Sequence, residues 1–155
     1  MIDARITEGP LDAPAEFAAF LASVSGDGAV ASFAGIARPT TTDGAVLTAM
    51  FLDHHPTLTA SSVAAIAAAA KDRFGLSAAV AVHRYGSIAP GETIVFVAAS
   101  AAHRRAAFEA ADYMMDRLKT EAIFWKREDT AGGSRWIEPT ETDHADRARW
   151  SDDGN

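Results

Sequence analysis

The sequence predicts a single α+β domain, in which strands and helices mix without the regular alternation of a parallel α/β fold. Residues 29–37 and 93–100 are apolar runs of the kind that form buried strands. An alanine-rich segment that opens at Pro56 indicates a long helix. Two short strand-like runs around a glycine-containing turn cover residues 122–138. These features favour a mixed or antiparallel sheet with a C-terminal β-hairpin.

The first half of the chain is expected to hold three strands and two helices. The strands are predicted at residues 3–7, 29–37 and 45–53. Asp12 can cap the first helix, which carries Pro14 in its first turn and runs to about residue 24. The second helix opens at Pro56 and is expected to end at Gly75, because glycine readily adopts the left-handed conformation that closes a helix.

The second half is expected to hold the remaining strands and one more helix. The strands are predicted at residues 78–86, 93–100, 122–128 and 135–138. Ser100 can cap the helix that follows it. One face of that helix is apolar: Ala107, Ala110, Ala111, Met114 and Leu118. We therefore expect one domain over residues 1–138, followed by a polar, acidic tail at 139–155 that is predicted to be mobile.

Composition excludes several kinds of protein. The chain has 155 residues, no cysteine and a formal net charge of -7. Without cysteine there are no disulfides, thiolate metal sites or cysteine nucleophiles. The negative charge argues against a general nucleic-acid binder, which needs a basic face. The first residues do not form a secretory signal, and no apolar run could span a bilayer, so we expect a cytoplasmic protein.

Basic residues nevertheless gather in the stretch "KTEAIFWKRE", residues 119–128. Lys119 is predicted to end a helix, where a cation suits the helix dipole. Lys126 and Arg127 end an aromatic strand. One interpretation is that the lysine stems cover apolar surface while their ammonium groups reach water. The other is a pocket that holds a small anion with fixed positive charge.

Three further cations open the helix after residue 100: His103, Arg104 and Arg105. Cations are unfavourable at a helix N-terminus, which attracts anions, so their placement there suggests a function. The alternative is a surface ion pair, such as Arg105 with Glu109 one turn later. Arg38 follows an apolar strand directly and is either a ligand contact or an exposed loop residue.

A metal site is not expected. Asp53, His54 and His55 carry metal-ligating side chains. Adjacent residues on a strand point to opposite faces, so the two histidines cannot easily share an ion. The chain also lacks a zinc-protease spacing, a phosphate-binding glycine loop and a nucleophile elbow around Ser32.

Three segments together resemble one family: "GAVASFAGIAR" at 28–38, residues 73–128, and "RWIE" at 135–138. They are similar to the large, catalytic subunit of molybdopterin synthase. The resemblance implies an α/β-hammerhead-type fold and no cofactor of its own. It also implies a sulfurtransferase that converts cyclic pyranopterin monophosphate to the molybdopterin dithiolene. The sulfur would arrive as a thiocarboxylate at the Gly-Gly C-terminus of a small ubiquitin-like partner, bound to a homodimer within a heterotetramer.

The resemblance also assigns roles to residues. Lys119 and Lys126 stand at the family's two active-site lysines, so they are the expected catalytic residues and also contact the substrate. Arg38, His103 and Arg104 would hold the phosphate and pterin, and Arg127 is counted with these substrate-binding residues. The expected reacting centre is Lys119, with Lys126 supplying charge and orientation at the same site.

Two departures from the family pattern stand out. Residues 39–44, "PTTTDG", differ from the usual loop after Arg38, and Thr140 stands where some relatives have an arginine that reaches the neighbouring subunit. An alternative function is therefore a catalytically silent homodimeric module that binds the partner's tail. A phosphate-ester hydrolase using the same basic pocket is a third possibility, and it lacks any metal or nucleophile signature.

Overall fold

The first of two β-sheets forms the centre of the molecule. The structure is a computed structural model that describes residues 1–151. Four strands lie in the order β1 (Ile2–Thr7), β4 (Ala78–Arg84), β6 (Thr93–Ala101) and β2 (Ala29–Ile36). Only β1 and β4 are parallel to each other. Every residue of β4 is buried, which explains why residues 78–82 are all apolar rather than alternating.

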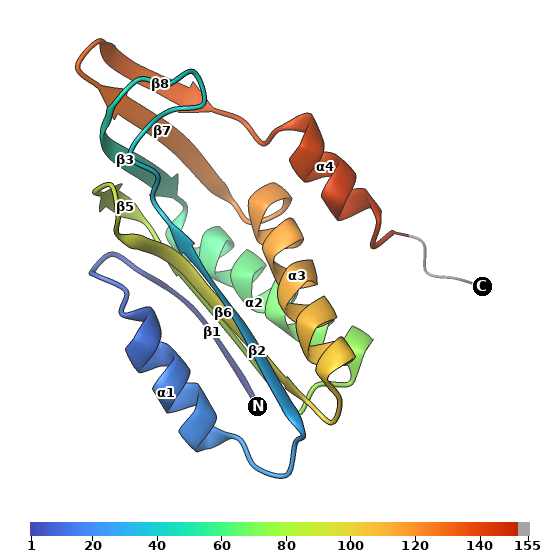
Figure 1. Ribbon diagram of the computed structural model, residues 1–155. Helices are drawn as coiled ribbons and strands as arrows, with labels where there is room; N and C mark the ends of the chain where they lie inside the picture. The colour runs from blue at the N-terminus through green and yellow to red at the C-terminus, as the bar shows by residue number, and fades with distance from the viewer. Residues whose placement is uncertain (152–155) are drawn as a thin grey trace.

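Helices cover both faces of this sheet (Figure 1). Helix α1 (Ala13–Ser23) packs on one face, where Phe20 and Leu11 contact Val80, Val82 and Phe96. Helices α2 (Pro56–Phe74) and α3 (Arg104–Thr120) pack on the other. The apolar face predicted for α3 is confirmed, since all five of its residues are buried there. The main core therefore lies between the sheet and the α2–α3 pair.

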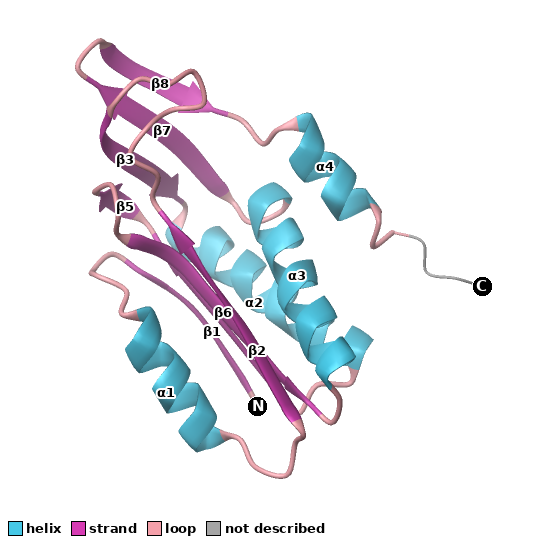
Figure 2. Cartoon of the chain, viewed as in Figure 1, coloured by secondary structure: helices cyan, strands magenta, loops and turns pink. Residues whose placement is uncertain are grey.

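The second sheet lies at one end of the first (Figure 2). It is antiparallel, in the order β5 (Gly86–Ile88), β3 (Leu47–His54), β7 (Phe124–Thr130) and β8 (Gly133–Ile137). Gly86, at φ +83°, follows β4 and lets the chain turn from one sheet into the other. The α+β class and the C-terminal hairpin, β7–β8, are confirmed.

Local signals placed most helix ends correctly, but not the start of α3. Asp12 accepts a hydrogen bond from Ala15 N, and Gly75 ends α2 at φ +62°. The predicted cap at Ser100 is wrong. Strand β6 continues through Ala101, and the fully buried Ser100 hydroxyl donates to Asp27 instead. The N-cap of α3 is His103, whose side chain makes no capping hydrogen bond.

The segment after residue 138 contains a helix where an irregular, mobile tail was expected. Helix α4 (Glu141–Ala148) begins with a capping box between Thr140 and Asp143. Beyond its end, Trp150 donates from Nε1 to Asp116 Oδ2 of α3 at 2.6 Å. These contacts fix α4 along α3. The last four residues of the predicted tail, 152–155, lie outside the described residues.

None of the helices in residues 1–151 is both long and apolar enough to cross a membrane.

Candidate functional site

Lys119 lies in the last turn of α3, at the end of the helix nearer the second sheet. More than half of its side chain is exposed. Its Nζ donates a hydrogen bond to Asp143 Oδ1 of α4 at 3.1 Å. Partial burial opposes ionisation of Asp143, but hydrogen bonds from Thr140 and Lys119 outweigh it and hold the pKa of Asp143 below its ordinary value. A carboxylate of the same chain thus neutralises one predicted catalytic lysine.

Lys126 lies on β7, opposite Leu52 of β3 and Ile137 of β8. Because side chains alternate along a strand, it shares a face with Phe124 and Glu128. Its Nζ is 3.3 Å from Glu128 Oε1. The Glu128 carboxylate is almost fully buried, and its Oε2 has no hydrogen-bond partner within residues 1–151. Lys126 is therefore the nearest charge that compensates Glu128.

A short connection at residues 121–123 links the two lysines, and α2 holds it in place. The fully buried Thr59 donates from Oγ1 to the Ile123 carbonyl at 2.5 Å. Ile123 N in turn donates to Ser62 Oγ at 3.2 Å. The Phe124 ring stacks on His83 of β4, with ring centroids 4.2 Å apart. These contacts set the position of β7, and so of Lys126, relative to the end of α3.

Arg38 lies at this same end of the molecule. The preceding residue, Ala37, packs with Met50, Leu52 and Ile88 in the core beneath the second sheet. Arg38 itself is exposed and forms no ion pair within residues 1–151. The structure thus brings three of the predicted residues, Arg38, Lys119 and Lys126, to one end.

The loop after Arg38 is closed by its own hydrogen bonds. Thr41, which is buried, accepts from Ala45 N and donates to Asp43. A single bridge pairs Thr40 with Val46. The unusual "PTTTDG" sequence therefore forms a compact turn rather than an open lid.

Arg127 points away from the lysines. It neighbours Lys126 on β7 and so faces the opposite side of the sheet. Its guanidinium donates two hydrogen bonds to Asp129, at 2.8 and 3.1 Å, and lies over the rings of Phe51 and Trp136. Hydrogen bonding to Arg127 lowers the pKa of Asp129. The structure does not bring Arg127 together with the other predicted substrate-binding residues.

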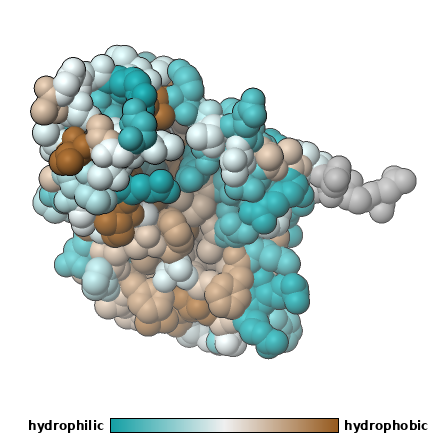
Figure 3. All heavy atoms as spheres, turned by 45° about the horizontal axis from the view of Figure 1, so that its top comes forward, coloured by the Kyte–Doolittle hydropathy of each residue, from teal (hydrophilic) through white to brown (hydrophobic). Residues whose placement is uncertain are grey.

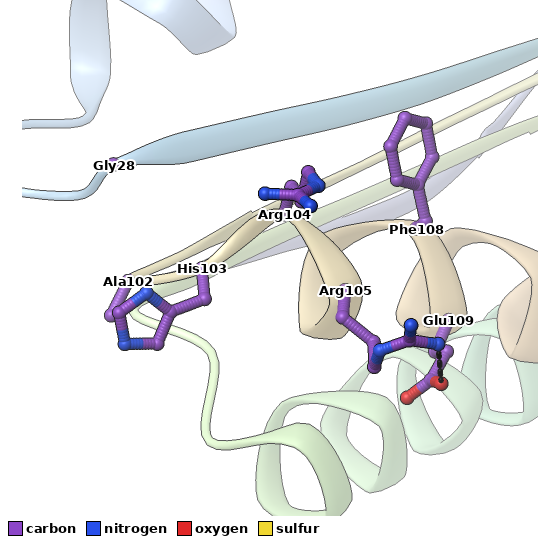
Figure 4. A pocket seen from close by; sticks show the side chains of 7 residues that line it. All are labelled: Gly28, Ala102, His103, Arg104, Arg105, Phe108 and Glu109. Carbon is purple, nitrogen blue, oxygen red and sulfur yellow. Dashed lines mark ion pairs between the residues drawn. The ribbon is translucent and has the colours of Figure 1, made fainter.

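His103 and Arg104 line an open cavity of about 620 Å³ at the start of α3. Figure 4 shows Arg104 and Phe108 on the side of α3 that faces β2, with Arg105 and Glu109 turned away from it. Arg105 pairs with Glu109 at 3.7 Å, the surface interaction that the spacing allowed. Arg104 forms no ion pair in the described part of the chain. Its charge remains available to an anion.

The two basic groups lie at opposite ends of α3. With a rise of 1.5 Å per residue, sixteen residues separate His103 from Lys119 by about 24 Å. All these residues were expected to lie around one anionic substrate. Within one chain the structure does not bring them together, because a straight helix separates them. One chain therefore carries two half-sites, His103–Arg104 and Arg38–Lys119–Lys126.

Comparison with known proteins decides the family. Residues 6–121 match the family model described as MoaE protein. The chain belongs to the MoaE family. A molybdopterin synthase catalytic subunit from Caulobacter vibrioides is 47% identical over 145 residues, which is 94% of this chain and 95% of the relative. As a MoaE protein, the chain takes part in molybdenum cofactor biosynthesis.

Solved structures agree with the MoaE assignment. The molybdopterin biosynthesis MoaE protein from Burkholderia ambifaria matches with a TM-score of 0.81 and 41% identity, covering 97% of this chain and 99% of the other. A complex of subunits 1 and 2 of molybdopterin-converting factor from Helicobacter pylori matches with a TM-score of 0.69. It covers 90% of each chain at 21% identity, so it supports the fold alone.

Several residues that suggested other chemistry have structural roles in this MoaE protein. His55 caps α2, with Nδ1 accepting a hydrogen bond from Leu58 N at 3.2 Å. His54 stacks on Tyr85, with ring centroids 3.8 Å apart. No group of three potential metal ligands gathers within residues 1–151. Thr140 is the N-cap of α4, which explains a threonine at this position.

Sequence reasoning missed the two carboxylates that pair with the lysines. Glu128 was detectable, because it lies two residues beyond Lys126 and so shares its face of a strand. Asp143 was also detectable, since Thr140–Asp143 has capping-box spacing. Its contact with Lys119, however, depends on how α4 packs on α3. No local sequence pattern predicts how α4 packs on α3.

Proposed function

We propose that this chain is the catalytic subunit of a molybdopterin synthase. It would transfer sulfur from the C-terminal thiocarboxylate of a small ubiquitin-like partner to cyclic pyranopterin monophosphate, forming the dithiolene. The observation that carries the proposal is the partly exposed pair Lys119 and Lys126, which lie at the same end of the molecule as Arg38. The name of the Caulobacter vibrioides relative, a molybdopterin synthase catalytic subunit, supports it.

The lysines suit an anionic acyl donor. Both ammonium groups are partly exposed and lie next to carboxylates that an incoming thiocarboxylate can replace. Lys119 would bind the thiocarboxylate and stabilise the charge that develops as its sulfur attacks the pterin. It would also transfer a proton as water attacks the acyl carbon of the resulting thioester, which breaks the carbon–sulfur bond, leaves the sulfur on the pterin and releases the partner's free carboxylate. Lys126, fixed on a strand, would orient the same group.

The absence of cysteine fits a reaction in which this chain supplies the lysines and the partner supplies the sulfur. The chain has no thiol of its own, so the sulfur that enters the product has to come from outside this chain. We propose that the partner's Gly-Gly tail enters the lysine half-site, and that two large subunits form a central homodimer within a heterotetramer. The His103–Arg104 half-site would hold the phosphate, with help from the N–H groups at the start of α3.

A reconstitution tests the proposal. The purified chain is mixed with thiocarboxylated partner and cyclic pyranopterin monophosphate, and the dithiolene is followed as its fluorescent oxidation product. Lys119→Ala should lower the rate by about a hundredfold or more while partner binding is retained. Lys71→Ala is a matched control, because Lys71 is the one other lysine of the chain and lies in the last turn of α2. Binding without product from the native chain would instead favour the silent module.

A further inference from the structure

The buried carboxylate of Glu128 lies between two cations. Lys126 Nζ is 3.3 Å from its Oε1, and Arg135 Nη2 is 3.8 Å from its Oε2. Within residues 1–151, Oε2 accepts no hydrogen bond. A buried carboxylate oxygen without a hydrogen bond is unfavourable, so Glu128 can still accept a closer donor on its Oε2 side.

Arg135 lies on the same face of the second sheet as Lys126. It stands directly opposite Glu128 in the β7–β8 ladder, and opposite residues of an antiparallel pair project to the same face. Its side chain is 58% exposed. Figure 3 shows hydrophilic residues spread over the end of the molecule that the second sheet forms. A movement of about 1 Å at this polar surface would bring a guanidinium N–H within hydrogen-bond distance of Oε2.

A second carboxylate attracts Arg135 at the same time. Arg135 Nη2 is 3.9 Å from Asp43 Oδ1, in the loop after Arg38. Figure 1 shows this loop, between β2 and β3, beside β8. Hydrogen bonds from the Thr41 hydroxyl and the backbone, together with the charge of Arg135, hold the pKa of Asp43 below its ordinary value. Arg135 is thus shared between two carboxylates and makes a close contact with neither.

The lysine half-site needs such a shared cation. An anionic tail that draws the Lys126 ammonium toward itself takes the nearer cation away from Glu128, whose side chain is only 8% exposed. A buried charge that loses its counter-ion is strongly destabilising. Without a replacement, the loss of this ion pair would oppose binding of the tail.

We propose that Arg135 is a positioning residue, which becomes the counter-ion of Glu128 when Lys126 turns to an anionic ligand. Arg135 closes on Oε2, so the buried carboxylate keeps a cation and Lys126 is free to bind. Arg135 itself does not touch the reacting atoms. The inference deepens the proposed function and rests on it, because the ligand is the carboxylate or thiocarboxylate at the end of the partner's tail.

An ordinary surface ion pair does not account for this arrangement. Exposed pairs contribute little, but here one partner is buried and one of its oxygens has no hydrogen bond in the described part of the chain. Arg127 cannot replace Arg135, because it projects from the opposite face of β7 and donates two hydrogen bonds to Asp129. Arg127 is therefore a matched control, with the same charge on the same sheet.

Titration with a peptide that ends in a Gly-Gly carboxylate tests the exchange of counter-ions. Arg135→Gln should raise the dissociation constant of the peptide at least about tenfold, and Arg127→Gln should change it by about twofold or less. Arg135→Lys should recover most of the affinity, because lysine can also approach Glu128. Equal affinities of the native chain and Arg135→Gln would overturn the inference.

Glu128→Gln separates positioning from direct binding. With no buried charge to compensate, Arg135→Gln should alter the affinity by about twofold or less in this background. A tenfold effect that persists there would mean that Arg135 binds the tail itself, and would overturn the positioning role. In the reconstitution, Arg135→Gln should raise the KM for the thiocarboxylated partner about tenfold and leave kcat within about threefold of native.

A double-mutant cycle on stability tests Arg135 without any ligand. Lys126→Met and Arg135→Gln each leave one cation beside Glu128 within residues 1–151, whereas the double variant leaves none. The unfolding constant from urea denaturation should therefore rise at least about tenfold more than the product of the two single effects. Single effects that simply multiply would overturn the inference. If the double variant does not fold, adding Glu128→Gln should restore folding, and a triple variant that stays unfolded would also overturn it.

Failure of the inference and failure of the function are distinguishable. If the native chain forms no dithiolene, the proposed function fails, while the stability cycle still decides whether Arg135 compensates Glu128. If the native chain is active and binds the peptide, but Arg135→Gln binds it equally well, the function stands. The positioning role of Arg135 is then wrong.

Discussion

Lys119 Nζ lies 3.1 Å from Asp143 Oδ1, and this pair joins the end of α3 to the first turn of α4. Lys126 has the same kind of partner in Glu128. Both predicted catalytic lysines are thus neutralised by carboxylates of their own chain when no anion is bound. An anionic tail that enters the site must displace these carboxylates from the lysines, and this competition lowers the affinity of the tail.

Asp143→Asn should strengthen binding of an anionic tail. Asparagine can still accept the capping hydrogen bonds from Thr140, so α4 should persist while the negative charge is lost. An exposed ion pair contributes about 0.2–1 kcal/mol, which predicts an affinity increase of about 1.4-fold to fivefold. Titration with a peptide that ends in a Gly-Gly carboxylate measures it. Asp146→Asn, on the same helix, is the control, and equal affinities in both variants would contradict the prediction.

Lys126 should affect stability and activity by separable routes. Lys126→Met leaves Arg135, 3.8 Å away, as the one cation paired with the buried Glu128 carboxylate within residues 1–151. We expect a loss of about 1–3 kcal/mol in unfolding free energy, less than for a fully buried pair because Lys126 is partly exposed.

The double variant Lys126→Met, Glu128→Gln provides the control for this effect. It should recover most of the stability, because the unpaired charge is gone, but none of the dithiolene formation. Denaturant unfolding and the reconstitution measure the two quantities. Recovery of activity with stability would mean that Lys126 acts only as a partner of Glu128.

Thr59→Val should lower stability and disturb the lysine half-site. The buried Thr59 hydroxyl accepts from His55 N at 2.9 Å and donates to the Ile123 carbonyl, and valine can pair with neither backbone group. The expected cost is about 1–3 kcal/mol in unfolding free energy. Thr57→Val is the control, because Thr57 is exposed in the first turn of α2. Equal urea midpoints for the two variants would show that Thr59 does not hold the connection.

Local patterns predicted the elements of this chain better than they predicted its site. The apolar run of β6, the proline at the start of α2 and Gly75 at its end are signals that act over a few residues, and each was confirmed. The resemblance predicted six site residues, but it could not show that α3 separates His103 from Lys119. That separation follows from the length of α3, whose two ends the sequence already indicated near these residues. Ser100 was misplaced because β6 extends one residue past the expected cap.

Arg127→Gln should leave catalysis nearly unchanged, in contrast with the sequence-based expectation that it binds substrate. Its guanidinium is held by Asp129 and by the rings of Phe51 and Trp136 on the face opposite Lys126. We expect kcat/KM for dithiolene formation within about threefold of native, against about a hundredfold loss for Lys119→Ala. A loss in Arg127→Gln comparable with that of Lys119→Ala would restore the substrate-binding role.

His83 should make the protein less stable in mild acid. Burial lowers the pKa of His83 from 6.5 to about 4, despite a contact of 2.8 Å between Nδ1 and the Arg84 carbonyl. Between these values the unfolded chain binds a proton that the folded chain does not. The free energy of unfolding therefore falls as pH decreases from 6.5, by about 2 kcal/mol at pH 5.

The range from pH 7 to 5 isolates this contribution of His83. Carboxylates with a lowered pKa, such as Asp143 and Glu121, contribute stability that is lost only at lower pH, as they protonate. His83→Gln can still donate to the Arg84 carbonyl but carries no titrating proton, so its unfolding free energy should change much less over this range. His144→Gln, exposed on α4, should keep the native slope. His83 stacks on Phe124 of β7. If the unfolding free energy of His83→Gln depends on pH as steeply as that of the native chain, the acid-sensitive group is not His83.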